Sequence, residues 1–167
     1  MQSGRLASCS IATLSRLIPI PILPSVLLEK KIPWTTDDSD LSQAVLVSLS
    51  ASGKTARGFA WQVLAKRAQG SGPLAFLQVT QAADAIGDVA SRHASIPSGV
   101  FSYSRLDGAV DMAAGLKPQK LVIVDFGARD NALKKFMRLL DEKPELKKVR
   151  NVIVHVGGEQ KVQPFPP

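Results

Sequence analysis

Small and hydroxyl-bearing residues, the types that suit phosphate binding, follow an apolar run in this sequence. The run Val45–Leu49 leads into Ser50-Ala51-Ser52-Gly53-Lys54-Thr55-Ala56. Apolar residues then recur at the spacing of a helix with one buried face: Ala56, Phe59, Ala60, Val63 and Leu64. A strand, a short turn and a helix N-terminus bring backbone N–H groups and the positive end of the helix dipole together. The sequence therefore predicts an anion-binding turn over residues 50–55.

Two classes of nucleotide-binding protein use such a turn, and a structural turn without ligand is a third interpretation. Gly53-Lys54-Thr55 resembles the end of the P-loop pattern G-x-x-x-x-G-K-[ST], and Leu121–Asp125 resembles a strand that ends in a magnesium-binding carboxylate. Ser48 stands where the P-loop requires its first glycine, inside the apolar run. The loop would be too short to wrap a β-phosphate. A P-loop nucleotide phosphotransferase or NTPase is therefore the less favoured alternative.

A dinucleotide turn needs small residues rather than a long loop. The spacing Ser50-x-x-Gly53-x-x-Ala56 is not the strict G-x-G-x-x-G pattern. It nevertheless puts small side chains where the backbone approaches the pyrophosphate and where the helix packs close to the sheet. The hydroxyls of Ser50 and Ser52 can also donate to phosphate oxygens. This spacing favours a dinucleotide site.

Predicted strands and helices alternate along the rest of the chain. Strands are expected at residues 74–79, 100–103, 120–124 and 151–156, and helices at 82–92 and 130–140. The segment 105–118 is polar, contains glycine and is assigned to no element. Alternation of this kind predicts a parallel sheet with right-handed crossovers. We predict an α/β, three-layer, Rossmann-like domain with five strands in the order 3-2-1-4-5.

The turn also carries a family resemblance. Ser50-Ala51-Ser52-Gly53-Lys54-Thr55-Ala56 resembles the phosphate turn S-A-S-S-K-T-A of an uncharacterised family related to quinone-reductase-type medium-chain dehydrogenases/reductases. Further matches fall in the same order within residues 44–158: Gln78-Val79-Thr80, Tyr103, Val124-Asp125-Phe126-Gly127 and Val154-His155-Val156-Gly157. The resemblance implies a nicotinamide-cofactor domain of an oxidoreductase-like protein.

The resemblance also implies where the dinucleotide would bind. The residues expected at the pyrophosphate are Ser50, Ala51, Ser52, Gly53, Lys54 and Thr55. Thr80 would lie at the adenosine ribose and Gly127 near the nicotinamide, with Tyr103 and Asp125 also at the cofactor. Since Thr80 and Gln81 are neutral and the first following acid is Asp84, we expect NADP(H) rather than NAD(H).

The sequence departs from medium-chain reductases outside this domain. We expect a poorly ordered leader or linker at residues 1–43, the cofactor domain at 44–158 and a disordered tail at 159–167. No segment reads as a substrate domain, so we expect no hydride transfer at an enzymatic rate from the chain alone and assign no catalytic residue. A non-enzymatic remnant or interaction module of the same fold is the alternative. A homo-oligomer or a second chain is a possible source of the missing half.

The composition of the chain argues against nucleic-acid, metal and membrane binding. The net charge is +7, but Lys and Arg are scattered without interleaved aromatic residues, so no nucleic-acid partner is expected. Cys9 is the only cysteine, and His93 and His155 show no pattern of acidic partners, so no metal is expected. The run Leu17–Leu28 is short and broken by prolines, so no membrane span is expected. Because Glu29 is the first acid, a mitochondrial leader is the alternative to a cytoplasmic location.

Overall fold

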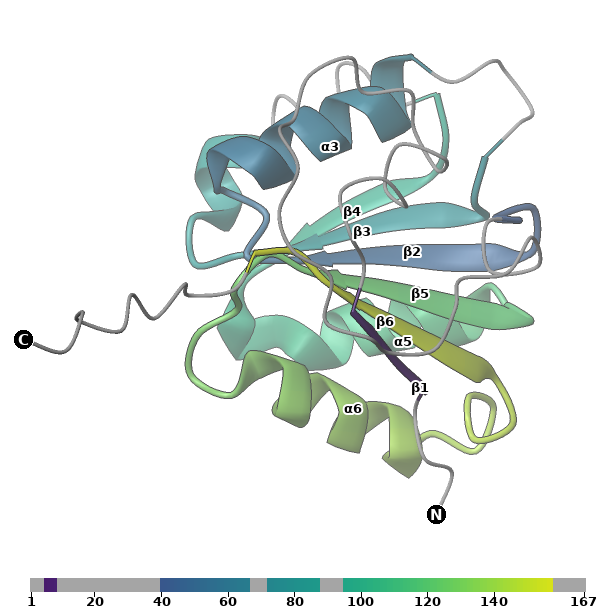
Figure 1. Ribbon diagram of the computed structural model, residues 1–167. Helices are drawn as coiled ribbons and strands as arrows, with labels where there is room; N and C mark the ends of the chain where they lie inside the picture. The colour runs from purple at the N-terminus through teal and green to yellow at the C-terminus, as the bar shows by residue number, and fades with distance from the viewer. Residues whose placement is uncertain (1–4, 9–39, 67–71, 88–94, 158–167) are drawn as a thin grey trace, which may run out of the picture.

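A parallel β-sheet forms the centre of the protein (Figure 1). The computed structural model describes residues 5–8, 40–66, 72–87 and 95–157. The strands are β1 (Arg5–Ser8), β2 (Ala44–Leu49), β3 (Ala75–Val79), β4 (Ser98–Phe101), β5 (Lys120–Asp125) and β6 (Arg150–His155). The helices are α3 (Lys54–Ala65), α5 (Leu106–Gly115) and α6 (Ala132–Glu142), with a short 3-10 helix η1 (Tyr103–Arg105).

The strand order is β1-β6-β5-β2-β3-β4, and all neighbours are parallel. The predicted order 3-2-1-4-5 corresponds to β4-β3-β2-β5-β6 and is confirmed. Alternate residues of each strand face opposite sides. Val45, Val47 and Leu49 pack in the cluster that contains α5 and α6, whereas Ala44 and Leu46 pack in the cluster that contains α3. Helices thus cover both faces, as predicted for a three-layer Rossmann-like fold (Figure 1).

The chain leaves β2 toward one face of the sheet and leaves β5 toward the other. These two strands are neighbours, with Leu49 opposite Asp125 in the register. The chain after β2 enters α3, above the sheet in Figure 1, and the chain after β5 leads to α6 below it. The switch point therefore lies between the carboxyl ends of β2 and β5, where ligands bind in open α/β sheets.

An additional strand lies at the edge of the sheet, within the segment expected to be a poorly ordered leader. Residues Arg5–Ser8 form β1 and pair with β6, from Arg5 opposite Val152 to Ser8 opposite His155. No sequence pattern indicates this strand, because a four-residue edge strand can be held by backbone bonds alone. The remaining leader at residues 9–39 and the tail from 158 lie outside the described residues.

The third predicted strand is displaced by two residues. We expected a strand at 100–103, whereas β4 runs from Ser98 to Phe101 and Tyr103 lies in η1. Gly99 lies inside this strand. A Cβ at position 99 would lie 2.7 Å from the Phe101 ring and 3.0 Å from the Met112 sulfur. Absence of a side chain at this position lets Phe101 fold back over the strand.

Sequence patterns did not predict α5, because its buried stripe consists largely of small residues. Leu106, Ala109, Val110 and Ala113 are buried at helical spacing, but glycines and aspartates between them lower the apolar signal. The expected helix at 82–92 is described only in part, with helical residues at 83–87. Of the described helices, none is long and apolar enough to cross a membrane.

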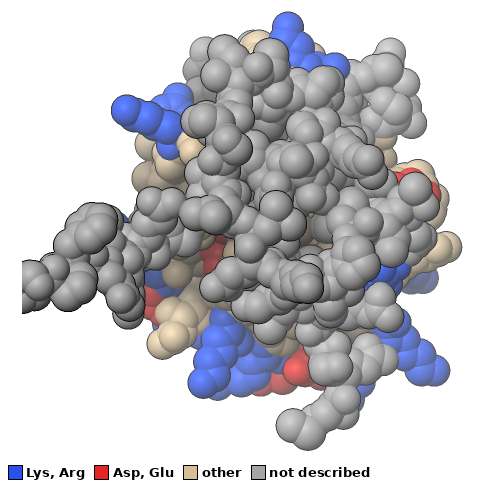
Figure 2. Space-filling model, viewed as in Figure 1, with Lys and Arg blue, Asp and Glu red and all other residues tan. Residues whose placement is uncertain are grey.

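The helices α3 and α6 follow their apolar spacing. In α3 the residues expected to be buried are buried, and Phe59 packs edge-on against Phe76 of β3. In α6, Phe136 and Leu140 are buried while Lys134, Lys135 and Arg138 are exposed. Figure 2 shows Lys and Arg around the rim of one face with acidic side chains between them. The described basic residues on that face form no single patch.

Replacement of Phe136 should reveal how strongly α6 is held to the sheet. Phe136 is fully buried. Phe136→Ala should lower the free energy of unfolding by about 3–5 kcal/mol, because it removes contacts and leaves a cavity. Lys135→Ala on the exposed side of the same helix should change it by less than about 0.5 kcal/mol. Urea unfolding followed by circular dichroism measures both, and equal effects would contradict this packing.

Candidate functional site

The predicted anion-binding turn occupies the switch point. It starts at Ser50, whose φ of 60° is in the left-handed region. Ala51 is buried and donates its N–H to the Val79 carbonyl at 3.1 Å, and Gly53 donates to the Ser50 carbonyl at 3.3 Å. The turn is thereby fixed to the end of β3, while Ser52 through Thr55 remain exposed.

The N-terminus of α3 has the properties of an anion site. Its N-cap is Gly53, which has no side chain to bond the first N–H groups, and its first turn contains no acid. Gly53 has φ −64° and ψ 153°, a conformation open to any residue, and a Cβ there would make only an ordinary 3.7 Å contact with the Ser50 oxygen. Neither backbone strain nor packing among the described residues requires glycine here. The room that it leaves fits a phosphate brought close to the backbone.

A P-loop does not fit this turn. Ser48 is fully buried within β2, and its Oγ has no hydrogen-bond partner among the described residues. Only residues 50–53 separate β2 from α3, and Lys54 is the first residue of the helix. A turn of this length cannot encircle a phosphate as a P-loop does.

Thr80 lies beside the turn, but its hydroxyl is already engaged. It is 1% exposed, donates to Ser52 Oγ at 2.9 Å and accepts the Ala82 N–H at 3.3 Å. A threonine hydroxyl has a single proton to donate. Thr80 therefore orients the Ser52 side chain, instead of offering its proton to a ligand.

Tyr103 reaches the turn from η1. Its hydroxyl is hydrogen-bonded to Ser50, and Asp125 and Asp130 lie near enough to act on it. Burial raises the pKa of Tyr103, the hydrogen bonds with Ser50 oppose the rise, and the two carboxylates add to it. Contacts of this kind sustain an uncommon backbone conformation such as that of Ser50. The structure thus brings together Tyr103, Asp125 and the turn, which sequence reasoning had placed at one site.

Asp125 organises the loop after β5. Its side chain is 11% exposed, and Oδ1 accepts the N–H groups of Gly127 at 3.0 Å and Ala128 at 2.6 Å. Gly127 has a φ of 89°, which favours glycine. Asp125 Oδ2 lies 3.4 Å from Nδ1 of His155, the neighbouring residue in the sheet register. Asp125 therefore fixes both the loop and the imidazole.

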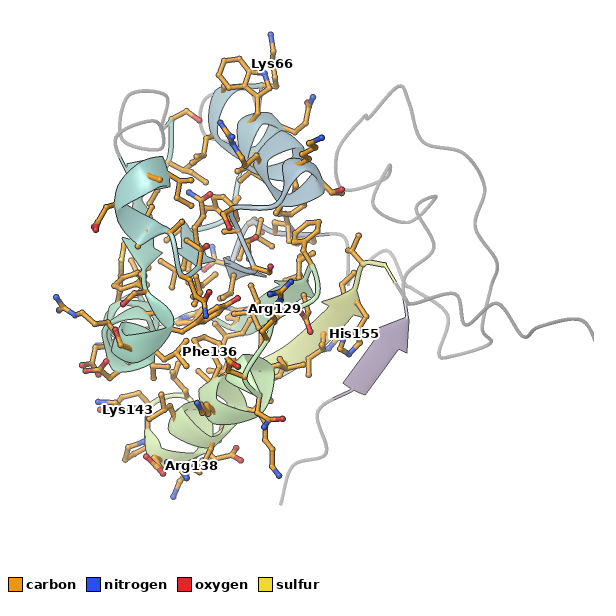
Figure 3. The ribbon with its side chains drawn as sticks, turned by 90° about the vertical axis from the view of Figure 1, so that its left-hand side faces the viewer. Lys66, Arg129, Phe136, Arg138, Lys143 and His155 are labelled. Atoms are coloured by element: carbon orange, nitrogen blue, oxygen red, sulfur yellow. The ribbon has the colours of Figure 1, made fainter. Side chains whose placement is uncertain are left out.

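This pair corrects the sequence analysis, which found no acidic partner for His155. Thirty positions separate the two residues, and only the pairing of β5 with β6 brings them together. An aspartate and a histidine that end two neighbouring parallel strands would have been the signal. Figure 3 shows His155 at the end of β6 and Arg129 on the loop before α6. His93 lies outside the described residues.

Sequence reasoning also missed an acid beside β3. Asp130, from the loop after β5, accepts a hydrogen bond from Gln81 Nε2 at 3.3 Å. Its φ of 57° lies in the left-handed region, which aspartate tolerates better than most residues. Although the residues directly after β3 are neutral, a carboxylate reaches them from another loop. Within the described ranges, no group of three His, Cys, Asp or Glu side chains is arranged to hold a metal ion.

The sheet order, the helices on both faces and the polar switch point define a Rossmann-like α/β protein. A family model described as "Protein of unknown function (DUF2855)" matches residues 23–166, and the chain belongs to this family. Neither the curated proteins nor the solved structures yield a match.

The single tyrosine makes the environment of the turn measurable. Tyr103 is the only tyrosine of the chain, so its ionisation is read directly from phenolate absorbance. We expect a midpoint above the ordinary value of 10.0 in the folded protein, because burial disfavours the phenolate. In urea the midpoint should return to about 10. Since the folded pKa is the higher, this group's contribution to stability falls as the pH rises through that window. Equal midpoints in the two states would contradict burial of Tyr103 against Ser50.

Proposed function

We propose that this protein binds a nicotinamide dinucleotide at the carboxyl ends of β2, β3, β5 and β6. The observation that carries the proposal is the uncapped N-terminus of α3 at the switch point of a parallel sheet. Backbone N–H groups and the helix dipole attract the pyrophosphate there, and the absence of acid in the first turn preserves the attraction. Lys54 adds a charge at the same position.

The two halves of the sheet suggest how the ligand lies. In Rossmann-like folds one mononucleotide lies on each side of the switch point. The adenosine half would lie over β2 and β3, with Ser52 held by Thr80 toward the pyrophosphate. The nicotinamide half would lie over β5 and β6, beside Gly127. Ser50, Ala51 and Gly53 contribute backbone to the turn, Thr55 lies in the first turn of α3, and Tyr103 contacts Ser50 from η1.

An oxidoreductase-like role follows from the ligand, since nicotinamide dinucleotides carry hydride. The competing proposal is a binding module of the same fold without turnover, and it shares every observation at the turn. A P-loop phosphotransferase is less compatible, because Ser48 is buried in β2 and the turn is short. Dinucleotide binding would distinguish the oxidoreductase and the binding module from a P-loop phosphotransferase. Turnover would then distinguish the oxidoreductase from the binding module.

We propose NADP(H) as the preferred form, because Thr80 and Gln81 after β3 are neutral and Gln81 is exposed. An NAD-type site would place an acid there to bind the ribose hydroxyl. Asp130 lies at Gln81, so its charge opposes a 2′-phosphate and should reduce the preference. The preference is therefore expected to be modest.

Titration of cofactor fluorescence tests the preference. NADPH should bind more tightly than NADH, and Asp130→Asn should tighten NADPH about two- to fivefold, as expected for loss of an exposed charge repulsion. NADH affinity should change little. Asparagine also tolerates the left-handed backbone at this position. Tighter binding of NADH by the unaltered protein would contradict the NADP(H) proposal.

Gly53 offers a test of the phosphate turn itself. Gly53→Ala should preserve the fold but weaken NADPH about five- to hundredfold, since a methyl group would crowd the approaching phosphate. Gly58→Ala is the matched control, because it lies on the same helix with open space around it and should leave affinity unchanged. Magnesium-dependent ATP binding without dinucleotide binding would replace this proposal with the P-loop.

A further inference from the structure

We infer that His155, oriented by Asp125, is the proton donor for reduction of a carbonyl substrate at this edge of the sheet. The inference deepens the proposed function and rests on it. It also supplies a proton donor, which could not be assigned from the sequence, and it departs from the expectation that the chain alone transfers no hydride at an enzymatic rate.

The geometry leaves one imidazole nitrogen for a substrate. Nδ1 of His155 faces Asp125 Oδ2 at 3.4 Å, so Nε2 points to the other side of the ring. The His155 side chain is 41% exposed, whereas Asp125 is 11% exposed and is held by two loop N–H groups. A fixed carboxylate beside an accessible imidazole sets the tautomer and the orientation of the ring.

The position of the pair agrees with the proposed cofactor geometry. Asp125 and His155 end β5 and β6, the half of the sheet on which the nicotinamide would lie, and the phosphate turn belongs to the other half. Tyr103 is less suited to the role, because its hydroxyl is bonded to Ser50. Among the described residues of the nicotinamide half, His155 combines exposure with an orienting carboxylate.

The reaction balances with one proton from this side chain. When bound, the reduced nicotinamide supplies a hydride, which is a hydrogen with its electron pair. As that hydride reached the carbonyl carbon of an aldehyde, quinone or enone, doubly protonated His155 would donate its Nε2 proton to the carbonyl oxygen and keep the proton on Nδ1. A C–H and an O–H bond form, while the carbonyl π bond and the N–H bond break. An enone is reduced here at its carbonyl. The carbonyl gains two electrons, the cofactor is oxidised, and neutral His155 recovers a proton from water.

Two variants of the full chain test the assignment. His155→Gln should bind NADPH within about threefold of the unaltered protein, since His155 does not lie at the phosphate turn. With aldehydes, quinones and enones as probes, kcat for NADPH oxidation should fall about 10²- to 10⁴-fold in His155→Gln, the range for loss of a general acid. Asp125→Asn should lower it as well, because its amide N–H faces Nδ1. Lys135→Gln, on the outer side of α6, is the control and should leave kcat unchanged.

A measurement without cofactor or turnover completes the test. Nitrogen NMR of the imidazole in the free protein should show the neutral ring protonated at Nδ1, and Asp125→Asn should move that proton to Nε2. The inference is overturned if this spectrum is the same in both proteins, if the unaltered protein binds NADPH but reduces none of the probes, or if His155→Gln retains kcat within threefold. Failure to bind any nicotinamide dinucleotide would instead overturn the proposed function.

Discussion

The pairing of β2 with β5 is the constraint on which the site depends. Both strands are buried along their whole length, because helices cover the two faces of the sheet. At their carboxyl ends the burial stops, and the chain turns toward α3 after β2 and toward α6 after β5. The pair Leu49 and Asp125 marks this limit in the register. Polar groups gather there, and ligands bind at such a switch point in open α/β sheets.

The charges at this edge of the sheet differ between the β2 side and the β5 side. On the β2 side, the positive end of α3 is uncapped and Lys54 adds a further positive charge. On the β5 side, Asp125 and Asp130 provide carboxylates, one engaged with loop N–H groups and His155 and the other with Gln81. An anionic pyrophosphate suits the first side, and acid–base chemistry suits the second. Hydride transfer from a bound nicotinamide dinucleotide to a carbonyl would use both, which is the physical basis of the function proposed for this member of the family.

Helices with large buried side chains were predicted from the sequence, whereas a helix with small buried side chains was not. Helices α3 and α6 carry Phe59 and Phe136 on clear apolar faces, and their existence was predicted. Helix α5 buries mainly Ala109, Val110 and Ala113, and its small residues gave too weak a pattern. The start of β4 was misplaced because Gly99 is typical of a turn, although in the strand it leaves space for the Phe101 ring. Strand β1 depends on pairing with β6, which no local pattern in residues 5–8 encodes.

By itself the sequence determined the strand–turn–helix unit at residues 45–64, because its apolar spacing and small residues are local properties of the chain. It also determined the order of the central strands, since alternating elements with right-handed crossovers allow few arrangements. The pairs that define the chemistry were decided by the tertiary structure: Asp125 with His155, Gln81 with Asp130, and Tyr103 with Ser50. Each pair joins loops or strand ends far apart in sequence. The two residues of each pair come close only when the buried strands have paired in register. Residue type and spacing along the chain therefore do not predict these pairs.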